Sequence, residues 1–271
     1  MTLTLTLREA PAAPVDARAL SVDGLAGLGR AEVERVELWH GNRRAPVGEL
    51  FAVAGSPSDE LRLEGDLAAV HGIGVRMSAG RLVVAGNAGA HTGAQMRGGE
   101  LFVEGDTGDW TGAEMSGGLV VVRGSGGSGL GAGYPGPRAG MRGGEIIVHG
   151  DAGAGPAAGL RRGLVAVVGR AGAHAGFRML AGTFVALGAV GAHPGADMRR
   201  GTIVAMSAPR FLPTFSFACT YRPPHLALVL RRLAELGAPI RAAHLEGRYR
   251  RYSGDMLDLG RGEILVLEDG T

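Results

Sequence analysis

A unit of 19 residues recurs along much of this chain and restricts the folds that it can adopt. Each unit begins at a position that we call the anchor, which is methionine in six units and leucine in one. The anchors are Met77, Met96, Met115, Met141, Leu160, Met179 and Met198, spaced by 19 residues except for one spacing of 26 after Met115. Glycine stands three residues after every anchor, and nine and twelve residues after the first six. Self-similarity at a fixed period identifies a repeat architecture, so we predict a solenoid in which each unit stacks on the next.

The length and the glycines of the unit exclude helical repeats. A helical hairpin repeat needs about 33 residues or more, and each glycine inside a helix costs about 1 kcal/mol relative to alanine. Glycine is instead typical of turns, where the backbone needs a positive φ or a close approach. A short apolar run such as Leu82-Val83-Val84 separates the first two glycines of each unit. We therefore predict an all-β fold in which each unit forms one coil of a β-helix, with coils about 4.8 Å apart.

Stacking converts each position of the unit into a column of side chains. The anchors and the apolar residues five and seven positions after them, which we call the inner column, should form the core. We interpret the methionines as gap-filling core residues rather than as metal or cofactor ligands. The position six residues after the anchor, the outer column, should face away from this core, yet it is also apolar. Its residues are Val83, Phe102, Val121, Ile147, Ala166, Val185 and Val204.

A strand that is apolar on both faces is usually covered on both. We therefore expect either the chain's own C-terminal segment or another protein to pack on the outer column. Replacing Phe184 and Val185 together with aspartate is predicted to release partner proteins or to unfold the late coils.

The chain divides into three parts on the basis of these patterns. Residues 1–60 form a strand-containing N-terminal segment, residues 61–207 form the glycine-rich β-helix with a degenerate first coil near Leu61, and residues 208–271 form a C-terminal cap with one helix and a returning strand. Four aromatic side chains within residues 211–221 suit a cap, because an uncovered solenoid end is prone to aggregation.

Outside the repeat, hydrophobic alternation and helix breakers predict the remaining elements. They are strands at 2–7, 33–38 and 50–53, a helix opened by Pro223-Pro224 and stopped at Gly237, and a strand over 260–267 that extends or caps the sheet.

Composition excludes several classes of function. The net charge is +2, and arginines alternate with acidic residues, so we expect no nucleic-acid partner. The chain contains no lysine, which excludes a Schiff-base lysine and a phosphate-loop lysine. The single cysteine, Cys219, excludes an internal disulfide and a zinc-thiolate site. No signal peptide and no apolar run of about 18 residues is present, so we expect a cytoplasmic protein without a membrane contact.

Histidine occurs in three units at the position fourteen residues after the anchor, which we call the turn column. These residues are His91, His174 and His193. His174 and His193 belong to neighbouring coils and should lie about 5 Å apart. A metal site needs a third and a fourth ligand. Trp110 occupies the same column, but no acidic residue does. We therefore interpret the histidines as exposed turn residues or interface contacts, and we predict no metal site and no catalytic residue.

The insertion of seven residues lies within a glycine-rich loop over 124–140. Its backbone N–H groups could cradle a phosphate. No helix follows it and no lysine supports it, so we favour a protruding docking loop. The sequence does not identify cofactor-binding residues.

Arginines form a row beside the anchors. They are Arg97, Arg142, Arg161 and Arg199, each directly after an anchor, with Arg162 and Arg200 next to them. A solvated turn is the simplest interpretation of this row. A stacked arginine row could also meet an acidic partner surface or a polycarboxylate ligand.

The repeat also resembles a known family. The unit Met96-Arg97-Gly98-Gly99-Glu100-Leu101-Phe102-Val103-Glu104-Gly105, followed by Gly108 and Gly112, resembles the glycine-rich β-helix in the C subunit of formylmethanofuran dehydrogenase. The C-terminal domain of the large subunit of glutamate synthase is similar. The ending Arg250-Arg251-Tyr252-Ser253-Gly254-Asp255 resembles the tails of these C subunits and favours that family. The resemblance implies a right-handed parallel β-helix of about seven coils with a small α-containing C-terminal cap.

The resemblance further implies a non-catalytic scaffold subunit of a hetero-oligomeric complex. In methanogens, the complex fixes carbon dioxide as formylmethanofuran with tungsten or molybdenum subunits. In methylotrophic bacteria, a related formyltransferase/hydrolase complex passes a formyl group from tetrahydromethanopterin through a methanofuran-type cofactor to formate. The arginine-rich, lysine-free composition favours the methylotroph complex. Its amidohydrolase-like, formyltransferase and dehydrogenase-like subunits would then be the partners, and the methanofuran-type cofactor and the metals would belong to them, with no cofactor bound by this chain.

Other interpretations remain open. The C subunit of a tungsten or molybdenum dehydrogenase and a glutamate synthase-type scaffold are alternatives within the non-catalytic class. A β-helix enzyme with a groove site needs Asp, Arg or His stacked in adjacent coils, and only His174 and His193 come close. A hexapeptide-repeat acyltransferase would show a period of 6 or 18, whereas this chain has a period of 19.

Overall fold

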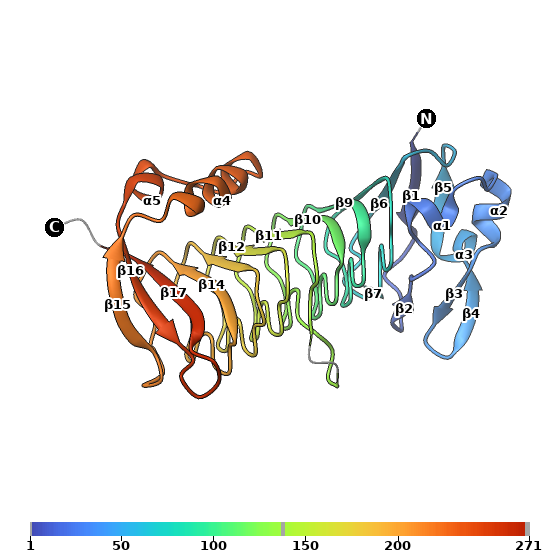
Figure 1. Cartoon of the computed structure of the whole chain (residues 1–271). Coiled ribbons are helices and arrows are strands. Elements are labelled where there is room, and N and C mark those ends of the chain that lie inside the picture. The colour runs from blue at the N-terminus through green and yellow to red at the C-terminus, as the bar shows by residue number, and fades with distance from the viewer. Residues whose placement is uncertain (1, 137–138, 269–271) are drawn as a thin grey trace.

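The chain is built mainly of β-strands, with short helices near its two ends (Figure 1). The computed structural model describes residues 2–136 and 139–268. The strands in these ranges form one sheet of thirteen strands and a second sheet of four. The prediction of an all-β fold is therefore confirmed.

Eight parallel strands form the middle of the large sheet. They are β6 (Glu60–Glu64), β8 (Arg81–Ala85), β9 (Arg97–Val103), β10 (Gly117–Val122), β11 (Glu145–Val148), β12 (Leu164–Val167), β13 (Thr183–Ala186) and β14 (Arg200–Ala205). Their pairing follows the repeat: Leu101 pairs with Val120, and Val120 pairs with Ile146 across the insertion. Leu61 pairs with Leu82, so the segment near Leu61 adds a strand in the register of the repeat. The insertion therefore leaves the register of the sheet unchanged.

A second column of parallel bridges joins the coils on another side. We call it the short ladder; it consists of Leu67, Ala88, Thr107, Gly126, Ala152, Ala171 and Val190. From Ala88 onward, each of these residues stands eleven positions after an anchor. Each of the first six repeat units thus contributes a strand to the large sheet and a residue to the short ladder.

The inner column forms the main core, as predicted. The anchors are fully buried, and they share one cluster with residues such as Leu82, Val84 and Phe184. The glycine three residues after each anchor makes the stacking possible. At Gly118, φ is +88°, and an added Cβ would lie 2.8 Å from the carbonyl oxygens of Gly98 and Gly99. A side chain at this position would push neighbouring coils apart.

The outer column forms a second core under the C-terminal helix α4 (Pro224–Glu235). Leu226, Leu230 and Leu233 of α4 pack with outer-column residues such as Val121 and Val185. Arg232 of α4 also donates to Glu145, with its Nη2 2.8 Å from Oε2. Figure 1 shows α4 lying across the strands of the sheet. The chain's own C-terminal segment is thus the cover that the apolar outer column predicted.

Phe184 and Val185, which were predicted together to contact partners or stabilise the late coils, lie in different cores. Phe184 belongs to the inner cluster and Val185 to the cluster under α4, and both are fully buried. A charged side chain at either residue would therefore destabilise the fold before it could affect a contact with a partner.

Additional strands extend the large sheet at both ends. At the N-terminal end, β1 (Leu3–Leu7) pairs with β6 and with β5 (Phe51–Ala54). At the C-terminal end, β17 (Arg261–Leu267) pairs with β14 in the register of a repeat, with Gly262 opposite Gly201. Then follow β16 (Tyr249–Gly254) and the edge strand β15 (Ser216–Tyr221). The predicted returning strand over 260–267 is confirmed.

Several short helices were not predicted. They are α1 (Val22–Leu25), α2 (Arg30–Arg35), α3 (Val47–Leu50) and α5 (Ala242–Glu246). Val33 lies in α2 and Leu50 ends α3, so the strand predictions at 33–38 and 50–53 were wrong at their starts. The prediction of one helix after residue 208 was wrong as well, because α5 follows α4. Helices of four to six residues are too short to show a helical period in sequence.

The four-stranded sheet lies at the N-terminal end of the molecule (Figure 1). Its strands are β4 (Arg43–Pro46), β3 (Glu37–His40), β2 (Val15–Asp16) and β7 (Val70–His71), in that order. The parallel pair of Val15 with Val70 joins the N-terminal segment to the first coils. No helix within residues 2–136 and 139–268 is long and apolar enough to cross a membrane.

Candidate functional site

The turn column has a left-handed backbone in each unit that carries a large side chain there. His91, Trp110, His174 and His193 have φ of 62°, 63°, 62° and 59°. This conformation is uncommon outside glycine, and it turns the chain sharply at each corner. The rings of His174 and His193 stack with their centroids 5.4 Å apart, as the repeat predicted.

The third histidine has a different environment. The Nδ1 atom of His91 lies 2.8 Å from the hydroxyl of Tyr134, which belongs to the insertion loop. The Tyr134 ring also packs on Trp110, with a centroid distance of 5.2 Å. The described part of the loop therefore folds back onto the turn column, and residues 137–138 lie outside the described ranges. Its role in docking stays a prediction. Among the described residues, no group of three or more His, Cys, Asp and Glu side chains could hold a metal ion.

An open cavity of about 1370 Å³ lies between the N-terminal segment, the turn column and the insertion loop. Its lining includes Asp16, Arg18, Trp39, His71, His91 and Tyr134. The sequence did not predict this cavity, because the lining residues come from separate segments and share no repeat position. The one available signal was His91, which the repeat pattern grouped with the turn column.

The polar groups of the cavity are held by specific contacts. Arg18 donates to Asp16, with Nε 2.9 Å from Oδ1, and this contact lowers the pKa of Asp16. The N–H of Ala90 donates to Nδ1 of His71 at 2.9 Å, so a neutral His71 carries its proton on Nε2.

The surroundings of His91 and Tyr134 favour the neutral form of both rings. Burial, with the nearby His71 and Arg18, lowers the pKa of His91 below its ordinary value, and burial raises the pKa of Tyr134. The cavity thus combines paired charges with neutral hydrogen-bonding groups, an arrangement that suits binding.

The predicted arginine row lies along one edge of the coils. Arg97, Arg142, Arg161, Arg162 and Arg200 are exposed, and none contacts an acidic side chain within the described residues. Arg199 differs, because its Nε lies 2.6 Å from Oδ2 of Asp258. The register also places Arg261 of β17 beside Arg200 of β14. The row therefore continues beyond the repeat and carries mostly unpaired positive charge.

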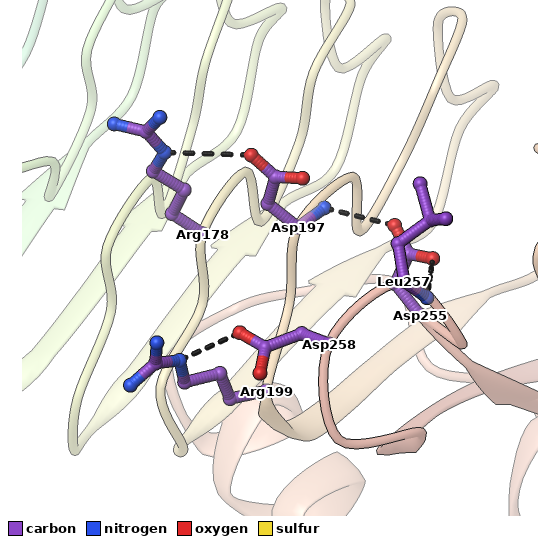
Figure 2. Close-up of polar contacts among 6 residues, drawn as sticks. All are labelled: Arg178, Asp197, Arg199, Asp255, Leu257 and Asp258. Atoms are coloured by element: carbon purple, nitrogen blue, oxygen red, sulfur yellow. Dashed lines mark hydrogen bonds and ion pairs between the residues drawn. The ribbon is translucent and has the colours of Figure 1, made fainter.

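The loop over 255–260, between β16 and β17, is fixed to the last coil by its carboxylates (Figure 2). The buried carboxylate of Asp255 accepts the N–H of Asp197 at 3.1 Å and the N–H of Leu257 at 3.0 Å. In the preceding coil, the equivalent N–H of Arg178 instead donates to the carbonyl of Ala196, at 2.8 Å. Asp255 thus replaces the carbonyl that a further coil would have supplied.

This loop presents large apolar side chains to solvent. Met256, Leu257 and Leu259, which we call the apolar tip, are 51%, 77% and 52% exposed. They were not predicted, although three large apolar residues between Gly254 and Gly260 were a usable signal. Exposed apolar groups that cluster in this way mark interaction sites more often than isolated ones do.

Comparisons with known proteins identify relatives by sequence and by structure. No family model matches the chain. The C subunit of tungsten-containing formylmethanofuran dehydrogenase 2 from Methanothermobacter wolfeii is 33% identical over 97 residues, which is 34% of this chain and 36% of the relative. The C subunit of the molybdenum-containing dehydrogenase 1 from Methanosarcina barkeri is 35% identical over 82 residues, or 28% of this chain and 27% of the relative. The matches thus span 36% and 27% of the length of these curated relatives.

A solved structure matches over the whole length. A chain in the crystal structure of the formyltransferase/hydrolase complex (FhcABCD) from Methylorubrum extorquens, determined with methylofuran, has a TM-score of 0.92 and 35% identity. The match covers 98% of this chain and 100% of that chain. On this full-length similarity, and on the similarity to the C subunits of the dehydrogenases, the chain belongs to the family of formylmethanofuran dehydrogenase C subunits, which includes a subunit of the formyltransferase/hydrolase complex.

Proposed function

We propose that this chain is a non-catalytic scaffold subunit of a cytoplasmic formyltransferase/hydrolase complex. The complex would move a formyl group from formyl-tetrahydromethanopterin, through a methanofuran-type cofactor, to formate in one-carbon metabolism. The observation that carries the proposal is the full-length match to a subunit of the FhcABCD complex, with 35% identity and a TM-score of 0.92. An amidohydrolase-like, a formyltransferase and a dehydrogenase-like subunit would be the partners, and they would hold the cofactor and the metals.

The architecture that we propose is a right-handed parallel β-helix of about seven 19-residue coils over 61–207. The segments 1–60 and 208–271 would close its two ends. The constant register of β8 to β14 and the short ladder support the coils. The right hand is what the resemblance to the C subunits implies. Because α4 covers the outer column from Val121 to Val204, a scaffold of this kind has to bind partners through other surfaces.

A tungsten or molybdenum formylmethanofuran dehydrogenase is the second candidate for the complex. The partial matches to the C subunits from Methanothermobacter and Methanosarcina favour it. The full-length structural match favours the formyltransferase/hydrolase complex. The partner subunits distinguish the two.

Native mass spectrometry of the tagged chain, purified from its own organism, tests the proposal. We expect an assembly that contains an amidohydrolase-like chain and a formyltransferase chain. A tungsten- or molybdenum-containing partner would replace our first candidate with the second. A stable chain without any partner, at a protein concentration near 1 μM, would contradict the scaffold function and direct attention to the cavity around His71 and His91.

A further inference from the structure

The apolar tip and the arginine row lie along one edge of the molecule. Asp258 of the tip loop contacts Arg199, and Arg261 follows the loop directly and lies beside Arg200. The next unit has Leu180 and Ala181 at the two positions after its anchor, and the row resumes beyond it with Arg161, Arg162 and Arg142. Since strands lie about 4.8 Å apart, the edge from Arg142 to Arg261 spans four strand steps, or about 19 Å.

The tip is held in place although its apolar side chains are exposed. Asp255 fixes the start of the loop through the N–H groups of Asp197 and Leu257 (Figure 2). The N–H of Met256 donates to the carbonyl of Thr214 at 3.1 Å. Leu257 is nevertheless 77% exposed. A fixed loop with exposed leucines is prepared for binding, because little conformational entropy remains to be lost.

The charge of this edge is not neutralised within the described chain. Arg142, Arg161, Arg162, Arg200 and Arg261 are exposed and form no ion pair with the described acidic residues. Arginines on neighbouring strands, such as Arg200 and Arg261, repel one another, so opposite charge from outside stabilises the row. Arginine also binds carboxylates in a bidentate manner. The chemistry of the edge therefore fits an acidic surface that carries an apolar pocket at one end.

We propose that this edge is the docking surface for a partner subunit whose acidic surface contacts the arginine row and whose apolar pocket receives Leu257 and Leu259. The inference rests on the proposed function, since it assumes a hetero-oligomeric complex. It adds which face of this chain the partner binds and what chemistry that partner surface has. In the complex, the tip would supply the buried apolar contacts. The row would orient the partner subunit and increase the rate at which the two chains associate.

Two variants test the two parts of the surface. Leu257→Asp/Leu259→Asp places charge in the apolar tip, and Arg161→Glu/Arg162→Glu reverses charge in the row. Matched controls are Leu228→Asp, at an exposed leucine of α4, and Arg231→Glu, at an exposed arginine of the same helix. All four changes are at exposed side chains, so each chain should keep the melting temperature of the wild type.

The readout is association of each tagged chain with its partners in the purified complex, at two salt concentrations. We expect both test variants to weaken association by at least about 30-fold, as loss of central interface side chains does. The controls should bind like the wild type, and the wild-type complex should weaken as salt rises. Normal assembly of both test variants would overturn the docking surface while leaving the scaffold function intact.

Further outcomes separate the two proposals. If the wild-type chain has no partner, the scaffold function itself fails. If the arginine variants release only material that nuclease digests, the row binds nucleic acid and the proposed protein partner is wrong. If a test variant melts earlier than the wild type, the single variants Leu257→Ser and Arg162→Gln replace it, and their normal assembly would overturn the proposal equally.

Discussion

The carboxylate of Asp255 accepts the backbone N–H of Asp197 at a distance of 3.1 Å. This bond ends a series in which the residue before each anchor donates to a carbonyl of the next coil, such as Arg178 to Ala196 at 2.8 Å. A side chain thus completes the hydrogen bonding of the last corner, so the stack ends there without a free N–H at Asp197.

Asp255→Asn should therefore lower the free energy of unfolding. The amide keeps one acceptor oxygen but loses the charge and one of two accepted bonds, which predicts a loss of about 1–3 kcal/mol. Chemical denaturation measures the loss. Asp258→Asn is the matched control, because its ion pair with Arg199 is partly exposed and contributes about 0–1 kcal/mol. Equal losses for the two variants would contradict this account of Asp255.

The contact between His91 and Tyr134 should weaken in mild acid. The pKa of His91 is lowered from 6.5, first by burial and then by His71 and Arg18. The folded state therefore disfavours the charged ring. The stabilisation of the folded state by a neutral His91 is complete above the unfolded pKa of about 6.5, and it is lost as the pH falls through the lower, folded pKa.

Tryptophan fluorescence reports this change, because Tyr134 packs on Trp110. Trp39→Phe removes the second tryptophan. We expect the Trp110 emission to shift below about pH 6.5. In Tyr134→Phe, which lacks the hydroxyl, the shift should be smaller. A pH-independent spectrum between pH 5 and 8 would exclude titration of His91 as the cause.

Two leucines on one helix should differ strongly in their effect on stability. Leu230 is fully buried against the outer column, whereas Leu228 is 68% exposed. Leu230→Ala should cost about 2–5 kcal/mol because it leaves a cavity under α4. Leu228→Ala should change stability by no more than about 0.5 kcal/mol. Thermal and denaturant unfolding of the pair measures the difference, and similar losses would place α4 elsewhere.

Two glycines with positive φ separate backbone strain from steric contact. Gly27 has φ of +79° and no atom within 4 Å of an added Cβ, whereas Gly118 has φ of +88° and carbonyl oxygens at 2.8 Å. Gly27→Ala should cost about 1–2 kcal/mol for the left-handed backbone alone. Gly118→Ala should cost at least about 2 kcal/mol more, because the coils have to separate. Comparable unfolding curves for the two variants would show that the coil contact has no effect.

The sequence predicted best what the repeat determines. Pairing of Leu101 with Val120 and burial of the anchors follow from a constant period, because stacking puts equal positions on top of one another. The sequence predicted that the outer column is covered, either by the chain's own C-terminal segment or by another protein. The pattern could not choose between them, because an apolar face does not specify its partner.

Features that depend on contacts between unrelated segments were not predictable. The cavity joins Arg18, Trp39, His71 and Tyr134, which no spacing rule connects.

Other features depend on local contacts that leave no periodic pattern in the sequence. The helix α2, for example, is fixed by the bond from the Gly29 N–H to Glu32 at 2.6 Å. The apolar tip was missed because exposure is a property of the folded loop.

The length of α4 matches the number of strands that it covers. A helix of 12 residues is about 18 Å long. The outer column from Val121 to Val204 spans four strand steps, or about 19 Å. Deleting one of these five units would preserve every pairing rule of the sheet and bring β9, with Phe102 in its outer column, one strand step further under the helix. The length of the helix is therefore coupled to the number of strands that it covers and not to the total number of repeat units, so a chain of this kind can gain or lose a unit at β8 or β9 without a change in its covering helix.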